Sequence, residues 1–208
     1  MYEKYGQFTD GKWHKSSNGE TYEVINPANE EVLGQASKAS PEDVNKALLS
    51  AQKGLEVWRK TPPWQRAYIL RRIADKMREK QDILAKWMTL EVGKPFAEAK
   101  GEVNGAADIY EWNAEETKRI YGQTVESRFE DTRVHVYYQP VGVVAALVPW
   151  NFPLVLSARK ISTALAAGCS VIVKPDVITP GVVMEQVEIC RECGVPPGVV
   201  NLLSGDPP

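Results

Sequence analysis

The sequence predicts an α/β protein that combines a Rossmann-like parallel sheet, an N-terminal helical bundle and a protruding antiparallel β-hairpin. Three apolar runs, at 141–148, 169–173 and 199–203, alternate with segments in which apolar residues recur at helical spacing. This β-α-β-α-β order is typical of a parallel sheet with right-handed crossovers. Helical spacing also dominates residues 41–121, whereas residues 123–139 alternate with the period of two that indicates a strand.

The chain divides into three expected parts. An N-terminal arm and a helical region occupy residues 1–122, a β-hairpin occupies 123–140, and the βαβαβ unit occupies 141–208. At 208 residues the chain is long enough to bury a sizeable core. Because the sheet ends after only three parallel strands, we expect the third strand to leave an open edge and exposed apolar surface.

Composition and charge argue against nucleic-acid and membrane binding. The net charge is −2 and no basic run is present, so no field attracts nucleic acid or an anionic membrane. The longest apolar run, 141–150, is too short to span a bilayer, and the N-terminus lacks the apolar core of a signal peptide. Three cysteines cannot all be paired, and a chain of this size does not require disulfides, so we expect a reducing, cytoplasmic setting.

Short β-like segments separated by turn residues fill residues 1–40. Residues 7–10 and 21–25 predict a hairpin whose polar tip is the Ser-Ser-Asn-Gly run at 16–19. We interpret this region as a small sheet that covers a helix end, with a docking surface as the alternative.

Four helices are expected between residues 41 and 121. Ser40 is a suitable N-cap for the first, and proline follows it at the first helical position. The others are expected to start near residue 64, to cover 82–91 and to run from 96 to 121.

Polar residues on these helices are expected to face solvent. On the second helix we predict that Tyr68 faces inward and Arg66 outward. The fourth helix carries acidic residues all round its axis, which indicates a solvated face rather than a carboxylate cluster: Glu98, Glu102, Asp108, Glu111, Glu115 and Glu116.

Ligands of parallel α/β sheets bind beyond the carboxyl ends of the strands. The turns at 149–151, 174–177 and 204–206 fall at these ends, so the topology brings them to one edge. Asn151 offers a side-chain donor beside the backbone amides of a helix start, which suits an oxyanion hole or an anion site; capping the helix is the alternative. Lys174 could hold a phosphate or ribose oxygen, or it could extend its ammonium group to solvent.

Other polar residues near this edge give weaker signals. Lys160 lies within an apolar helix and is expected to be partly buried, which requires a partner or a shifted pKa. Thr179 is the expected cap of the second crossover helix. Cys190 and Cys193 form a C-x-x-C, but without a second pair we favour two buried helix positions over a metal or redox site. The sequence contains neither G-x-G-x-x-G nor a Walker A loop.

Eight segments, taken in order along nearly the whole chain, resemble the aldehyde dehydrogenase superfamily. The upstream segments are INPANEEVLG, TPPWQRA, TLEVGKP and QPVGVV. The downstream segments are PWNFPL at 149–154, ARK at 158–160, ALAAGCSVIVKP at 164–175 and GVPPGVVNLLSG at 194–205. The resemblance implies an incomplete aldehyde dehydrogenase fold, because the nucleophilic cysteine, the general-base glutamate and most of the catalytic domain of the family would follow residue 205.

The resemblance also implies a cofactor, NAD or NADP, and assigns residues to it. Asn151 would stabilise the oxyanion of the thiohemiacetal, and Lys160 would lie near a proton-relay carboxylate. Lys174 would contact the adenine ribose. The residues expected to line the nicotinamide and pyrophosphate side are Leu147, Val148, Pro149, Trp150 and Asn151, and those expected to complete the cofactor site are Asp176, Val177 and Gly205.

Two positions depart from the family pattern. Val177 stands where the family often has a glutamate that binds the ribose hydroxyls. Either Asp176 compensates or the ribose is held less firmly, and the discrimination of NAD from NADP would weaken. Pro207 stands near a position where the family often has a glycine of the pyrophosphate turn.

The implied function is oxidation of an aldehyde to a carboxylic acid by thiolate attack, hydride transfer and thioester hydrolysis. This chain alone is expected to be inactive, since we expect none of its three cysteines to be the nucleophile. The hairpin at 123–140 would mediate homo-oligomerisation. The alternative is a catalytically inactive module that binds a nucleotide or another subunit.

Overall fold

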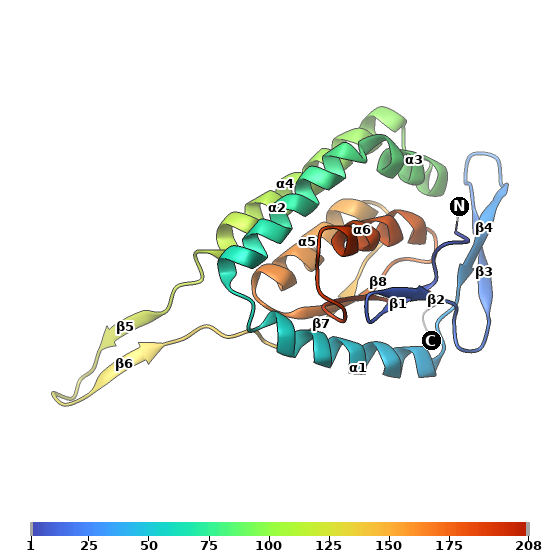
Figure 1. The fold of residues 1–208 in the computed structure, drawn as a ribbon. Helices are drawn as coiled ribbons and strands as arrows, with labels where there is room; N and C mark the ends of the chain where they lie inside the picture. Colours follow the sequence, from blue (N-terminus) through green and yellow to red (C-terminus); the bar gives the residue numbers. More distant parts are fainter. Residues whose placement is uncertain (1, 207–208) are drawn as a thin grey trace.

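Five strands form a mixed sheet in the order β2-β1-β9-β8-β7 in the computed structural model, which describes residues 2–206 (Figure 1). The parallel strands are β7 (Val143–Leu147), β8 (Ser170–Lys174) and β9 (Val200–Leu202). Two antiparallel strands, β1 (Gln7–Thr9) and β2 (Lys12–His14), extend the sheet. The α/β class and the Rossmann-like parallel unit are therefore confirmed.

The crossover helices are α5 (Pro153–Ala166) and α6 (Pro180–Glu192). They cover one face of the sheet, whereas α1 (Pro41–Trp58) lies across the opposite face (Figure 1). Both crossovers begin directly after the carboxyl end of a strand, so the turns that precede α5 and α6 lie at the same edge of the sheet. This arrangement positions the candidate site.

The predicted open edge at the third parallel strand is wrong. Phe8 of β1 pairs with Leu202 of β9, so the N-terminal hairpin covers that edge. The side-chain amide of Gln7 is fully buried and binds the backbone of Ser204, accepting from its N–H at 2.8 Å and donating to its carbonyl at 3.2 Å.

Strand β7 forms the other edge, because no strand within residues 2–206 pairs with its outer side. It was predicted to be buried on both faces, but Leu147 is 65% exposed and Ala145 is also exposed. The alternate residues Ala146 and Val148 are buried, so an apolar run does not ensure that a strand is buried on both faces.

The N-terminal strands pair differently from the prediction. Strands β1 and β2 connect through Asp10 and Gly11, both of which have positive φ, as in the tight hairpin turns that favour Asp-Gly. A second hairpin joins β3 (Thr21–Ile25) to β4 (Val32–Ser37). The polar run at 16–19 is therefore a connection between two hairpins and not a hairpin tip.

The helical region matches the prediction in number and order. Ser40 caps α1 in a capping box with Asp43, and the following helices are α2 (Pro63–Glu79), α3 (Gln81–Val92) and α4 (Phe96–Thr117). Helix α4 packs along α2 and α5 (Figure 1). Within residues 2–206, none of the helices has the length and apolar character required to cross a bilayer.

Two predictions for α2 are wrong. Arg66 is buried, and its Nη1 donates to the carbonyl oxygen of Thr61 at 2.7 Å, just before the Pro62-Pro63 break. Tyr68 is exposed, because α2 turns Ala67, Leu70 and neighbouring residues toward the core instead. The carbonyl group at the helix break pairs with Nη1, whereas the buried Nε of Arg66 has no hydrogen-bond partner within residues 2–206.

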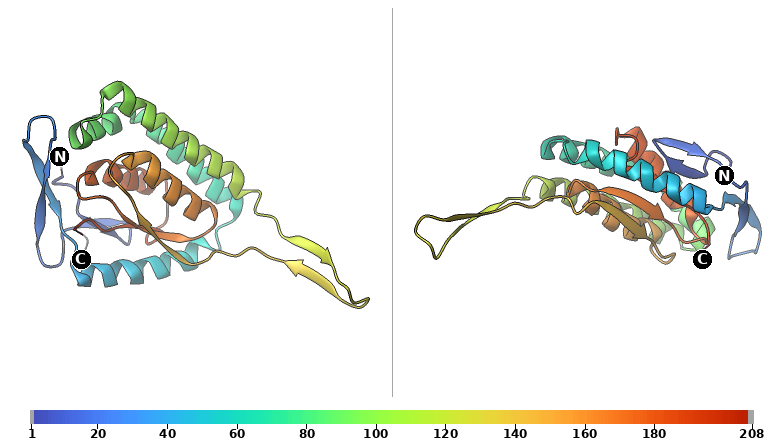
Figure 2. Two further views of the ribbon diagram at one scale, coloured as in Figure 1. Left: turned by 180° about the vertical axis from the view of Figure 1, so that it is seen from behind. Right: turned by 90° about the horizontal axis from the view of Figure 1, so that it is seen from below.

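The hairpin of β5 (Gln123–Glu126) and β6 (Arg133–Val136) extends away from the rest of the molecule, as Figures 1 and 2 show. Its register runs from Gln123 opposite Val136 to Glu126 opposite Arg133. Its position and polar tip agree with the prediction, and nearly all of its strand residues are exposed.

Candidate functional site

The carboxyl ends of the parallel strands meet as the topology predicts. Leu147 lies opposite Lys174, and the Val148 N–H donates to the Lys174 carbonyl oxygen at 3.0 Å. The Leu203 N–H donates to the carbonyl oxygen of Val173 at 2.9 Å. Backbone hydrogen bonds therefore fix the three turns relative to one another.

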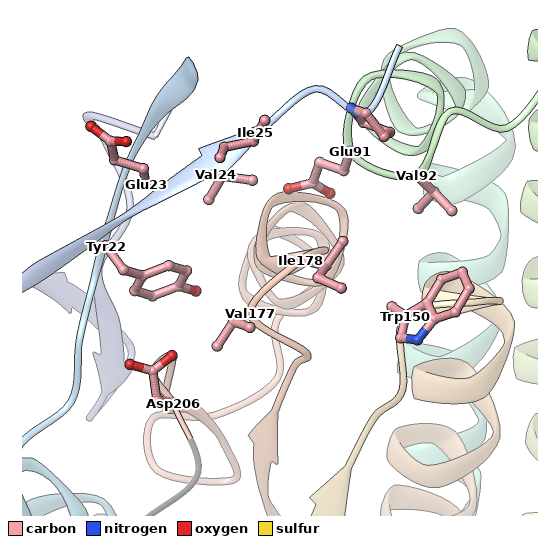
Figure 3. Close-up of a pocket in the computed structure, with 11 residues that line it drawn as sticks. Tyr22, Glu23, Val24, Ile25, Glu91, Val92, Trp150, Val177, Ile178 and Asp206 are labelled. Carbon is pink, nitrogen blue, oxygen red and sulfur yellow. The ribbon is translucent and has the colours of Figure 1, made fainter. Parts of the chain in front are cut away.

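Two cavities flank the turn at 149–152. The first, which we call the strand-end cleft, has a volume of about 500 Å³. Figure 3 shows that side chains from β3, α3 and the strand-end turns surround it, including Tyr22, Glu91, Trp150, Val177, Ile178 and Asp206. The second, which we call the α4–α5 cavity, has a volume of about 690 Å³, and its lining includes Lys94, Glu98, Asn151, Phe152, Val155 and Arg159. Neighbouring residues of one turn, Trp150 and Asn151, thus line different cavities.

Asn151 does not cap α5. The N-cap position is occupied by Phe152, which provides no side-chain acceptor, and Asn151 is exposed to the α4–α5 cavity. Its backbone carbonyl oxygen accepts a hydrogen bond from Lys94 Nζ at 3.2 Å. The capping alternative is therefore wrong.

The amides at the start of α5 are bound by Glu102, so they are not available as an anion site. Oε1 of Glu102 accepts from the N–H groups of Leu154 at 3.0 Å and Val155 at 3.2 Å. Glu102 is buried and forms an ion pair with Lys94. The prediction that Glu102 belongs to a solvated face is wrong, because the helix N-terminus and a lysine compensate the charge.

The first turn of helix α6 is capped in the same way, by the distant carboxylate of Glu91. This fully buried carboxylate accepts from the N–H groups of Gly181 at 2.6 Å and Val182 at 3.1 Å, and from the Tyr2 hydroxyl at 2.6 Å. Burial raises the pKa of Glu91 to about 7, although the three donors act in the opposite direction. Thr179, the predicted cap, makes no capping bond, and its buried hydroxyl has no hydrogen-bond partner within residues 2–206.

The remaining predicted cofactor residues lie at the strand-end cleft or next to it. Lys174 is half-buried, and Val177 lines the cleft. Oδ1 of Asp176 accepts from the Ile178 N–H at 3.1 Å, so this carboxylate shapes its own turn. Gly205 is buried where a Cβ would lie 3.1 Å from the Ala39 nitrogen. Pro207 lies outside the described residues.

The prediction that Lys160 is partly buried is wrong, because this residue lies on the exposed side of α5.

The three cysteines are all free and buried. Burial raises the pKa of Cys190 to about 12, and its Sγ lies 3.7 Å from the Tyr110 hydroxyl. A buried protonated thiol is a poor nucleophile. In the described part of the chain no group of three or more His, Cys, Asp or Glu side chains could hold a metal ion.

The sequence profile of the Aldehyde dehydrogenase family matches residues 13–208. Succinate-semialdehyde dehydrogenase [NADP(+)] of Escherichia coli is 45% identical over 94% of this chain, and glutarate-semialdehyde dehydrogenase of Pseudomonas aeruginosa is 44% identical over 95%. The chain spans 41% of the length of each. A crystal structure of Staphylococcus aureus betaine aldehyde dehydrogenase in complex with NAD+ superposes with a TM-score of 0.94 at 35% identity, over 97% of this chain and 42% of that one.

Proposed function

Because the chain belongs to the aldehyde dehydrogenase family and matches the N-terminal portion of its relatives, we propose that it supplies part of the cofactor site and the oxyanion donor of an enzyme that oxidises an aldehyde to a carboxylic acid. One observation carries this proposal. The turn at 149–152 directs Trp150 to the strand-end cleft and Asn151 to the α4–α5 cavity, so it separates two sites that a cofactor and an aldehyde could occupy.

The strand-end residues fit part of a nucleotide. Lys174 is a half-buried cation at the end of β8 and would bind a ribose oxygen, and Val177 and Trp150 give the cleft an apolar wall. The nicotinamide side would be lined by Leu147, Val148 and Pro149. The first-turn amides of α5 and α6 are bound by glutamates, so the pyrophosphate would need other donors. The cofactor, NAD or NADP, would accept hydride from the substrate.

Asn151 would perform the catalytic role assigned to this chain. When a thiolate attacks the aldehyde carbon, the carbonyl oxygen gains negative charge, and the Asn151 amide would donate a hydrogen bond to it. The three cysteines are buried, so the attacking thiolate would come from outside residues 2–206. Lys160, exposed on α5, would lie near a proton-relay carboxylate that this chain does not supply.

A chimaera tests the proposal directly. Residues 2–206 would replace the matching N-terminal 41% of the E. coli relative, and NADPH formation would be followed with succinate semialdehyde. We expect no turnover by the 208-residue chain alone and turnover by the chimaera. Asn151→Ala should lower the kcat of the chimaera about 10²- to 10³-fold, the usual cost of removing one oxyanion donor. An unchanged kcat would refute the role of Asn151.

The α4–α5 cavity favours an aldehyde with a second, anionic end. Both relatives compared above are named for semialdehydes of dicarboxylic acids. Arg159 lines the same cavity as Asn151 and forms no ion pair within residues 2–206. Of the acidic residues that also line the cavity, Glu102 and Asp108 are paired with Lys94 and Arg78, and Glu98 is exposed. A charge-assisted hydrogen bond contributes about 1.5–3 kcal/mol, so Arg159→Met should raise KM for succinate semialdehyde roughly tenfold or more while leaving KM for propanal unchanged. Equal effects on both substrates would contradict this assignment.

The alternative, an inactive module that binds a nucleotide or another subunit, is favoured by the exposed hairpin. Its apolar residues include Val125, Phe129 and Val134, and unpaired strand edges bind other chains.

We propose homo-oligomerisation through residues 123–140. From the three free cysteines we also propose a cytoplasmic setting. Light scattering of the chain with and without Val134→Glu tests the first, and calorimetric titration with NAD tests nucleotide binding. A monomer that binds no NAD would exclude this alternative.

A further inference from the structure

We propose that Lys94 and Glu102 form a positioning pair that fixes the turn carrying Asn151, an inference that rests on the proposed oxyanion role of Asn151. Lys94 lies in the loop between α3 and α4, and Glu102 lies early in α4. Both side chains reach the start of α5, more than 50 positions later in the chain. They are largely withdrawn from solvent, with exposed side-chain fractions of 10% for Lys94 and 2% for Glu102.

Glu102 replaces the local cap that α5 lacks. Phe152 at the N-cap position offers no acceptor, and Pro153 has no N–H group. The next two N–H groups, of Leu154 and Val155, both donate to Oε1 of Glu102. The first turn of α5 is therefore fixed to α4 rather than to its own preceding residues.

Lys94 fixes the residues just before the helix. Its Nζ donates to the carbonyl oxygen of Asn151 at 3.2 Å, lies 4.0 Å from the ring centroid of Phe152 and pairs with Oε2 of Glu102. Because Lys94 binds the backbone of Asn151, it constrains the position of that residue without using the side-chain amide. The amide group can then donate into the α4–α5 cavity that Asn151 lines.

The arrangement does more than cap a helix. A buried ion pair is costly to desolvate, and a Ser, Thr or Asp at position 152 would cap α5 locally. Glu91 caps α6 without forming an ion pair with a lysine, and it makes no bond to a residue that we propose to be catalytic. The added lysine connects the capping carboxylate to Asn151. Oxyanion donors act only when they are correctly placed, and a misplacement of about 1 Å can cost a factor of about 100.

Kinetics of the chimaera test the pair. Glu102→Ala and Lys94→Met should each lower kcat about 10- to 100-fold, the cost of misplacing a catalytic group, with changes in KM for the aldehyde below about threefold. Lys94→Arg, which keeps the charge, should restore most of the activity. Glu116→Ala is the matched control, because this residue lies on the same helix and makes only a surface ion pair with Arg119.

A double-mutant cycle separates positioning from general stability. If Glu102 acts through Asn151, then Glu102→Ala should lower kcat no further in the Asn151→Ala background. Multiplicative losses in the double variant, or a loss in Glu116→Ala equal to that in Glu102→Ala, would overturn the inference. No loss in Asn151→Ala would refute the proposed function itself, whereas a loss in Asn151→Ala alone would refute only the pair.

Amide exchange in the 208-residue chain gives a readout that does not depend on activity. In Glu102→Ala the N–H groups of Leu154 and Val155 should exchange faster, because their acceptor is gone. Those of Gly181 and Val182, bound by Glu91, should exchange at the original rate and report that the variant is folded. Unchanged exchange at both α5 amides would show that Glu102 does not hold this turn.

Discussion

Glu91 should make the stability of this protein fall as the pH rises. Burial raises its pKa from 4.5 to about 7. Below the lower value the carboxyl group is protonated in both the folded and the unfolded chain. Between the two values the unfolded chain releases the proton first, so the folded state loses stability until the pH passes about 7. Each unit of difference between the folded and the unfolded pKa corresponds to about 1.4 kcal/mol, so the total loss of stability is about 3 kcal/mol.

The perturbation is Glu91→Gln, which removes this titration and keeps one acceptor oxygen. Urea unfolding at about pH 5 and about pH 8 would give the free energy of unfolding of both proteins. Part of the loss has already occurred at pH 5, so between these two pH values the free energy of unfolding of the variant relative to wild type should rise by about 2.5 kcal/mol, even though the variant is less stable than wild type at the lower pH. Glu111→Gln, an exposed residue paired with Arg78, serves as the control. Parallel pH profiles of wild type and Glu91→Gln would refute the reasoning.

Three further predictions concern stability. Gly181→Ala should destabilise the fold by about 1–3 kcal/mol in urea unfolding, because a Cβ would overlap the Trp87 ring and lie 2.7 Å from Oε1 of Glu91. Gly101→Ala, in α4 with no atom within 4 Å of the added Cβ, should instead stabilise by about 0.5–1 kcal/mol, and a loss there would contradict the helix geometry. Thr179→Val should raise the melting temperature or leave it unchanged, since the hydroxyl that it removes is buried without a partner; a loss above about 1 kcal/mol would reveal an unrecognised hydrogen bond.

Local patterns in the sequence were sufficient for most elements. The three apolar runs and the helical spacing between them predict β7, β8 and β9 with α5 and α6, because each signal lies within one segment. Ser40 and the following proline locate the start of α1 equally well. The Asp-Gly pair at 10–11 was also a local signal, and reading it as a turn would have given the correct N-terminal pairing.

Contacts between distant segments were not predictable in this way. Glu91 and Glu102 look like ordinary helix carboxylates in the sequence, and only their positions beside α6 and α5 show that they cap these helices. The one available signal was indirect, since both helices begin with proline after a residue that forms no side-chain cap. The spacing of Asn151 left two roles open, an oxyanion donor and a helix cap. The structure excludes the cap, since Phe152 occupies that position. The oxyanion role follows from the family resemblance.

The pairing of β1 with β9 has a consequence for synthesis. Gln7 and Ser204 bind each other across 197 positions, so β1 leaves the ribosome well before β9 and must wait for it. At about 5–20 residues per second this delay is about 10–40 s. During that time β1 and β2 form an isolated hairpin, which is only marginally stable in water. Holding this N-terminal segment apart from neighbouring chains is therefore a task for chaperones or for its own polar residues.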